Sequence, residues 1–256
     1  MAYSPDFRAY PRASAATTAA VLDAGLRAYM LRVYNWMASG LLLTGLVAFA
    51  IANTSLINAF YPVVQTPFGT AHQPTVLAMI AMFAPLAFVL VLSLGVNKLS
   101  TTAAQALFWV FCAAMGASLT NIFLIYTSES IVRVFFITAG TFAATSIYGY
   151  TTKSDLTKMG GFLMMGLFGI IIAGLVNMFV GSSALQFAIS VIGVVVFTGL
   201  TAYDTQRIKA DYTEYAYAMG TDGAAKRSVY DALSLYLNFI NLFMMLLQLL
   251  GNRNNN

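Results

Sequence analysis

Hydrophobic residues gather into seven long runs along this chain, each followed by a short polar segment. A run of about 20 apolar residues is the length that an α-helix needs to cross the hydrocarbon core of a bilayer. We therefore predict an all-α, polytopic membrane protein with seven transmembrane helices. The runs are Val33–Ile51, Val76–Val96, Ala103–Tyr126, Ile131–Tyr150, Phe162–Val180, Leu185–Thr205 and Ala232–Leu250.

The segments outside the runs are short. Residues 1–32 are expected to form a cytoplasmic N-terminal tail, residues 33–250 the membrane domain and residues 251–256 a C-terminal tail. Part of the first tail, from about Thr17 to Arg32, could form an interfacial helix. The connection Asn53–Pro74 is the longest on its side and is expected to be a loop, because three prolines interrupt it.

Small residues recur inside the runs. Gly166, Gly169 and Ala173 stand at helical spacing in the fifth run. No hydrophobic force drives helices together inside lipid, so close packing depends on such small side chains. A compact bundle is expected.

Composition agrees with the pattern, since 59% of the residues are hydrophobic and only 9% are charged. The net charge of +4 comes from basic residues scattered singly, which argues against nucleic-acid binding. Cys112 is the only cysteine, and His72, the only histidine, has no ligand-type neighbours. With no phosphate-binding loop or catalytic motif either, we expect neither an enzyme nor a resident cofactor.

Basic residues divide unequally between the two sides of the predicted bundle. Eleven fall on the side of the N-terminus and two on the other. Cytoplasmic loops retain Lys and Arg, so the N-terminus is expected in the cytoplasm and the C-terminus, after seven crossings, outside it. The eleven are Arg8, Arg12, Arg27, Arg32, Lys98, Lys153, Lys158, Arg207, Lys209, Lys226 and Arg227; the two are Arg133 and Arg253.

An ionisable residue inside a membrane span is a functional candidate, and Asp204 is the first. It lies near the cytoplasmic end of the sixth run, three residues before Arg207. It either faces other helices or is exposed at the interface and paired locally with Arg207 or Lys209. Lys98, which closes the second run on the same side, is a further possible partner.

The last run carries a row of polar residues on one helical face. Asp231, Ser234, Asn238, Asn241 and Gln248 are spaced by three, four, three and seven positions. Lipid cannot satisfy their polar groups, so the row must face helices or water. It could serve as interhelical hydrogen bonding or line a polar path, and its length favours the path.

Several segments, in order, resemble one family. Ala202-Tyr-Asp-Thr-Gln-Arg-Ile208 and Ala232-Leu-Ser-Leu-Tyr-Leu-Asn-Phe-Ile-Asn-Leu-Phe243 resemble the closing signature of the Bax-inhibitor (transmembrane Bax-inhibitor motif) family. Tyr148–Leu156 resembles its fourth connection, and Leu31–Gly40 its entry into the first span. The resemblance extends from about Arg27 to Gly251, and the short tails are typical of a bacterial member, in the inner membrane.

The resemblance implies six helices around a central seventh and a calcium leak that responds to pH. In the family two aspartates of the last two spans share a proton beside a basic residue. Asp204 matches the first aspartate and Lys98 the basic residue, but the second position is Asn238. Replacing a carboxylate by an amide removes the like-charge repulsion that tunes such pairs. A weakened or displaced pH switch is therefore expected.

The expected function is a passive calcium leak, with Asp204 as the titratable gate and Asn238 as its partner. Asp204, Asn238 and Asn241 could give a permeant calcium ion transient oxygen ligands, with Asp204 a weak one. An alternative needs no pore: a protein that binds and modulates a membrane protease or other quality-control partner. Its contact surface would be the N-terminal tail or the Asp211–Ala225 segment.

Overall fold

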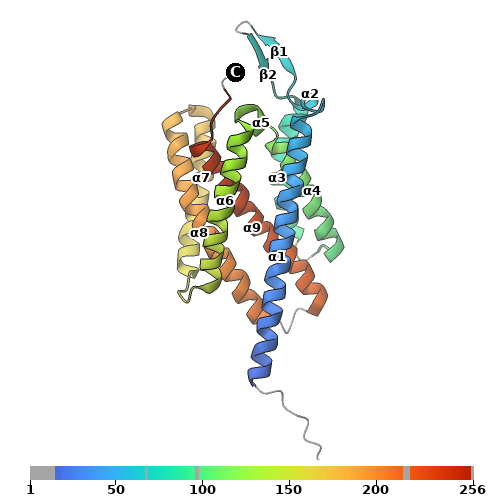
Figure 1. The fold of residues 1–256 in the computed structure, drawn as a ribbon, viewed down its shortest axis with the longest axis vertical. Helices are drawn as coiled ribbons and strands as arrows, with labels where there is room; N and C mark the ends of the chain where they lie inside the picture. The colour runs from blue at the N-terminus through green and yellow to red at the C-terminus, as the bar shows by residue number, and fades with distance from the viewer. Residues whose placement is uncertain (1–14, 67–68, 96–97, 216–219, 255–256) are drawn as a thin grey trace, which may run out of the picture.

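The computed structural model describes residues 15–66, 69–95, 98–215 and 220–254, which are nearly all helical (Figure 1). Long helices run up and down the long axis of the molecule, and the short elements gather at one end. The long helices are α1 (Ala15–Ala52), α3 (Val76–Gly95), α4 (Thr101–Leu119), α6 (Ser128–Thr151), α7 (Thr157–Val180), α8 (Ser183–Tyr215) and α9 (Gly220–Leu250). The short elements are α2 (Ile57–Phe60), β1 (Val63–Thr66), β2 (Gly69–His72) and α5 (Ile122–Ile125).

Six helical segments in the described chain are long and apolar enough to cross a membrane. They correspond to α1, α4 with α5, α6, α7, α8 and α9. The second predicted run forms α3, an apolar helix that contains Pro85. Its fully described part, Val76–Leu92, is shorter than the other six.

The outer surface of the bundle is apolar. Phe179 is 84% exposed and Leu94 80% exposed, and many other large hydrophobic side chains also point outward. Such a surface far exceeds the apolar patches that water-soluble monomers tolerate. A lipid environment removes this cost, because acyl chains solvate apolar side chains.

Helix α9 packs against four other long helices, α1, α4, α6 and α8. In Figure 1 it passes obliquely behind the space between α6 and α1. Tyr236, near its middle, is fully buried and packs edge-on against Phe108 and Phe111 of α4. The Tyr236 hydroxyl lies 2.7 Å from Thr44 Oγ1 of α1, so this buried polar atom has a partner.

The segment expected as a tail with an interfacial helix is the start of α1. Helix α1 is continuous from Ala15 to Ala52, so residue 32 marks no structural break. Leu26, Tyr29 and Met30 are buried in the bundle. Arg27 and Arg32 are exposed and interrupt the apolar sequence here, so hydropathy alone does not reveal this buried face. Residues 1–14 lie outside the described residues.

The connection Asn53–Pro74 contains a β-hairpin that the sequence analysis did not predict. Strands β1 and β2 are antiparallel and pair Val63 with His72 and Thr66 with Gly69. Each strand has only four residues, too few for a visible alternation of polar and apolar positions.

Residues 252–254, in the segment expected as the C-terminal tail, pair with another part of the chain. Tyr126 and Arg253 form a β-bridge. The Asn254 backbone N–H donates to the Ile125 carbonyl oxygen, and the Thr127 N–H donates to the Asn252 carbonyl oxygen. These bonds fix residues 252–254 against the connection between α5 and α6.

Only part of the small-residue pattern makes close helix contacts. Gly166 approaches Val196 of α8, but Gly169 is exposed and nothing lies near it. Closer approaches occur elsewhere: a Cβ at Gly149 of α6 would lie 2.2 Å from the backbone oxygen of Ala202 in α8. Glycine therefore sets the distance between α6 and α8 at this crossing.

Candidate functional site

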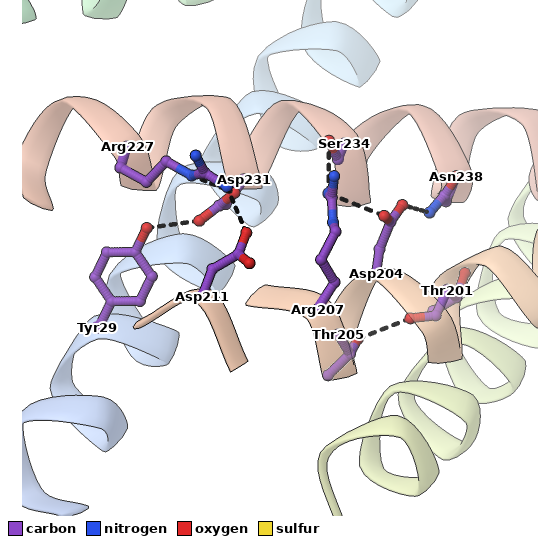
Figure 2. A network of polar contacts seen from close by, with 10 residues as sticks. All are labelled: Tyr29, Thr201, Asp204, Thr205, Arg207, Asp211, Arg227, Asp231, Ser234 and Asn238. Atoms are coloured by element: carbon purple, nitrogen blue, oxygen red, sulfur yellow. Dashed lines mark hydrogen bonds and ion pairs between the residues drawn. The ribbon is translucent and has the colours of Figure 1, made fainter. Parts of the chain in front are cut away.

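Polar side chains of α8 and α9 meet near the end of the bundle where α1 begins (Figure 2). The two helices are joined by a connection that includes residues 216–219 and pack closely along their length. A helix buries one stripe of its surface, so residues three or four positions apart on α8 can reach a similar stripe on α9. Asp204 and Asn238 occupy these facing stripes.

Asp204 points into the bundle rather than toward solvent. Its side chain is 14% exposed. One carboxylate oxygen, Oδ2, accepts a hydrogen bond from Asn238 Nδ2 at 2.7 Å. The other, Oδ1, lies 2.9 Å from Arg207 Nη2, one helical turn away. A buried carboxylate is costly without partners, and here each oxygen has an N–H donor.

Arg207 joins the aspartate to a second position of the polar row. Its Nη2 also lies 3.5 Å from Ser234 Oγ of α9, at the limit of a hydrogen bond. Figure 2 shows the guanidinium between Asp204 and Ser234. The sequence left open whether Asp204 faces other helices or pairs locally with Arg207. In the structure Asp204 does both, because its side chain is buried and also contacts Arg207.

Lys98 does not take the part that the resemblance assigned to it. It is exposed beyond the end of α3 and forms no ion pair with Asp204 among the described residues. Arg207 is the cation in contact with the carboxylate. Arg207 is three residues from Asp204 in the same helix, so the helical repeat alone brings the two side chains together. The position of Lys98 depends instead on how α3 packs against the bundle.

The polar row of α9 divides into separate contacts rather than one continuous lining. Asn241 donates to the Leu237 carbonyl oxygen of its own helix and does not reach Asp204. Gln248, at the far end, accepts hydrogen bonds from Gln186 and Ser190 of α8. The Gln248 contacts support the interhelical hydrogen-bonding interpretation for that end of the row, whereas Asn241 bonds within its own helix.

Asp231 belongs to a second cluster, next to the first along α9 (Figure 2). Its side chain is 4% exposed. Its Oδ2 accepts a hydrogen bond of 2.6 Å from the Tyr29 hydroxyl of α1, and its Oδ1 lies 3.3 Å from Arg227 Nε. Arg227 also pairs with Asp211 of α8 at 2.5 Å. The cluster thus ties α1, α8 and α9 together.

Sequence reasoning missed three members of this second cluster, Tyr29, Asp211 and Arg227. The spacing of Arg227 and Asp231 by four residues was a usable signal, because such pairs share a helical face. Nothing local identifies Tyr29, which comes from a helix 202 positions away in sequence.

The arrangement around Asp204 does not have the form of a resident calcium site. Calcium binds six to eight oxygen ligands, several of them carboxylates. Both oxygens of Asp204 face N–H donors, and one donor is a cationic guanidinium. No group of three or more potential metal-ligating side chains occurs in the described residues. Calcium contact here would have to displace Arg207 or Asn238.

Residues 26–255 match the family model described as inhibitor of apoptosis-promoting Bax1. The chain belongs to the Bax inhibitor-1 family. The match covers every described element of the Bax inhibitor-1 bundle except the first turns of α1, and it confirms the resemblance found in the motifs.

Bacterial relatives match over almost their whole length. An uncharacterized protein of Rickettsia prowazekii is 49% identical over 232 residues, covering 90% of this chain and 92% of the relative. The inner membrane protein YbhL of Escherichia coli K12 is 46% identical over 230 residues, covering 90% and 94%. A Caulobacter vibrioides protein is 45% identical over 247 residues, covering 95% and 96%. The chain is thus a Bax inhibitor-1 family membrane protein.

Proposed function

We propose that this Bax inhibitor-1 family protein is a pH-responsive calcium-leak protein of the bacterial inner membrane. The proposal rests mainly on Asp204, a carboxylate within the α8–α9 interface that contacts Asn238 and Arg207. An ionisable group inside a membrane span is costly, which makes it a functional candidate. The inner membrane is proposed because the similar Escherichia coli protein carries that location in its name.

The proposed architecture has seven spans, α3 among them, with six helices around α9. The alternating direction of the long helices supports it, as does the packing of α9 against four of them (Figure 1). The N-terminus is assigned to the cytoplasm. Arg27, Lys153 and Lys209 are among the cations at the end where α1 begins, whereas Arg133 and Arg253 lie at the other end.

Protonation of Asp204 is the proposed opening event. The charged carboxylate binds Arg207 and Asn238, and so holds α8 against α9 at this end. A neutral carboxyl group accepts the hydrogen bond from Asn238 less strongly and attracts the guanidinium much less. Both contacts that cross the interface here, Asn238 with Asp204 and Arg207 with Ser234, would then weaken. A permeant calcium ion would then meet oxygen atoms of Asn238, Asn241 and Ser234 in passing.

Calcium flux through the purified protein, reconstituted in vesicles loaded with a calcium-sensitive dye, tests this mechanism. Wild type should leak more as pH falls, and Asp204→Asn, which has no titratable group, should leak at a nearly constant rate. We expect the pH response to decrease about fivefold or more in this variant, as loss of a coupling free energy of about 1 kcal/mol predicts. Thr101→Val, which alters a distant hydroxyl on α4, is the matched control.

Asn238→Asp provides the opposite test. It places a second carboxylate beside Asp204, where two close negative charges cannot both ionise cheaply. The pH response should become steeper than in wild type. A steep wild-type response that this substitution leaves unchanged would contradict the gating role. Absence of leak at every pH would instead favour the alternative function, modulation of a membrane protease partner.

A further inference from the structure

A groove separates α1 from α6 on the outer surface of the bundle. Both helices pack against α8 and α9, and between them the groove encloses about 450 Å³. Leu31 and Ile147 line it and are 56% and 64% exposed, so it is open to the surroundings of the bundle. Its volume lies in the range of about 300–1,000 Å³ that small-molecule sites occupy.

The walls of the groove are almost entirely apolar. Met30, Met37 and Phe142 form the buried part, and Leu31 and Ile147 form the rim. The exception is a hydroxyl pair, Tyr34 with Ser146, whose oxygens lie 2.5 Å apart. Because these hydroxyls satisfy one another, the groove can hold a hydrocarbon chain without leaving them unpaired.

One end of the groove is basic. Arg27 is the first lining residue of α1 and Tyr150 the last of α6, and these two positions mark the end where α1 begins and α6 ends. Arg27 is exposed and forms no ion pair or hydrogen bond among the described residues.

We propose that this groove binds an anionic phospholipid from the surrounding leaflet, with an acyl chain along the apolar walls and the phosphate at Arg27. An arginine can bind a phosphate with two N–H groups. The groove opens sideways between two membrane-facing helices, so the bilayer supplies the ligand directly. Cations near a lipid surface favour anionic over zwitterionic headgroups. This proposal does not depend on calcium transport.

Native mass spectrometry of the purified protein tests the site. The protein in detergent is mixed with equal amounts of a phosphatidylglycerol and a phosphatidylcholine with the same acyl chains. We expect one tightly retained phosphatidylglycerol and a preference over phosphatidylcholine of about fivefold or more, the fold-change that one basic residue near the headgroup provides. Equal retention of the two lipids would overturn the proposal.

A substitution within the groove tests its location. Ala143 lines the groove on α6, whereas the next residue, Ala144, is exposed but does not line it. Ala143→Trp should fill the groove and abolish retention, and Ala144→Trp should leave retention unchanged. An equal loss in both variants, or no loss in either, would overturn the location. A dimer that only Ala143→Trp dissociates, with no lipid bound, would identify a second chain as the occupant and overturn the lipid proposal.

A charge substitution tests the headgroup contact and does not depend on how Ala143→Trp folds. Arg27→Gln should reduce the preference for phosphatidylglycerol about fivefold, the contribution expected of one cation. Arg32→Gln is the control, because Arg32 is exposed on the same helix but does not line the groove. An unchanged preference in Arg27→Gln, or the same decrease in Arg32→Gln, would contradict the assignment of the phosphate to Arg27.

Discussion

At the scale of single residues, a few positions leave no room for any other side chain. Gly149 is the clearest, because α6 crosses α8 there with backbone against backbone. Asp204 is constrained by its partners instead of by space, since both of its oxygens face donors. Packing limits the first position and hydrogen bonding the second, so substitutions at them should fail for different reasons.

Gly149→Ala should destabilise the protein although alanine is the better helix former. Helix propensity alone favours the change by about 1 kcal/mol. The new Cβ, however, would lie 2.2 Å from the Ala202 carbonyl oxygen, so α6 and α8 must separate. We expect a net loss of about 1–3 kcal/mol, the usual cost of overpacking.

Unfolding can be followed with a thiol-reactive dye, because Cys112 is the only cysteine and is fully buried. Gly140→Ala is the matched control on the same helix, since nothing lies within 4 Å of its Cβ position. It should unfold at or above the wild-type temperature. Equal behaviour of the two variants would show that the close approach of α6 and α8 does not limit stability.

At the scale of elements, α8 is the helix that carries Asp204, Arg207 and Asp211 of the candidate site. It packs against α6, α7 and α9, and one of its residues, Gln206, holds the connection between α6 and α7. The Gln206 Oε1 accepts from the Leu156 backbone N–H at 2.8 Å, and its Nε2 donates to the Ser154 carbonyl oxygen at 2.8 Å. This connection also contains Asp155, whose pKa is lowered because its carboxylate accepts hydrogen bonds from Thr157.

Gln206→Leu should release this connection while leaving the helices in place. The substitution keeps the size of the side chain but leaves two backbone groups without their partners, at a cost of about 1–3 kcal/mol. Trypsin should then cleave faster than in wild type at Lys153, which is exposed in the connection, or at Lys158, which is exposed in the first turn of α7. Gln105→Leu on α4 is the control. Unchanged cleavage in Gln206→Leu would contradict the role of Gln206.

At the scale of the whole molecule, the two ends of the bundle differ in chemistry. The end where α1 begins carries most of the cations, the Asp204 and Asp231 clusters and the basic end of the groove. The other end carries the hairpin and the C-terminal bridge. If the positive end is cytoplasmic, the proposed gate at Asp204 lies at the cytoplasmic end of the bundle.

Cysteine labelling should locate the two ends. In a Cys112→Ala background, Thr70→Cys places a thiol on the exposed hairpin and Ser154→Cys places one in the exposed connection at the opposite end. A membrane-impermeant maleimide applied to spheroplasts should label Thr70→Cys at once and Ser154→Cys only after permeabilisation. Labelling in the reverse order would invert the proposed orientation, and simultaneous labelling would contradict an up-and-down bundle.

Much of the fold could be predicted from sequence. The apolar runs locate the long helices to within a few residues, although α1, α8 and α9 extend well beyond their runs at the cationic end. For the site, the sequence marked Asp204 as a candidate, and the family resemblance supplied Asn238 as its partner. The sequence alone did not decide whether Arg207 or Lys98 contacts Asp204. Both residues are basic, and both are expected at about the same depth in the membrane as Asp204.

The sequence by itself determined that the chain enters a membrane, where its helices lie and which face of α9 is polar. These properties depend on the composition and periodicity of each helix by itself, because each span meets the bilayer independently of the others. Only the tertiary structure decided that Tyr29 reaches Asp231, that Gly149 touches α8 and that a groove separates α1 from α6. Lipid solvates every apolar face almost equally, so the rotation and spacing of helices depend on contacts between residues far apart in the chain.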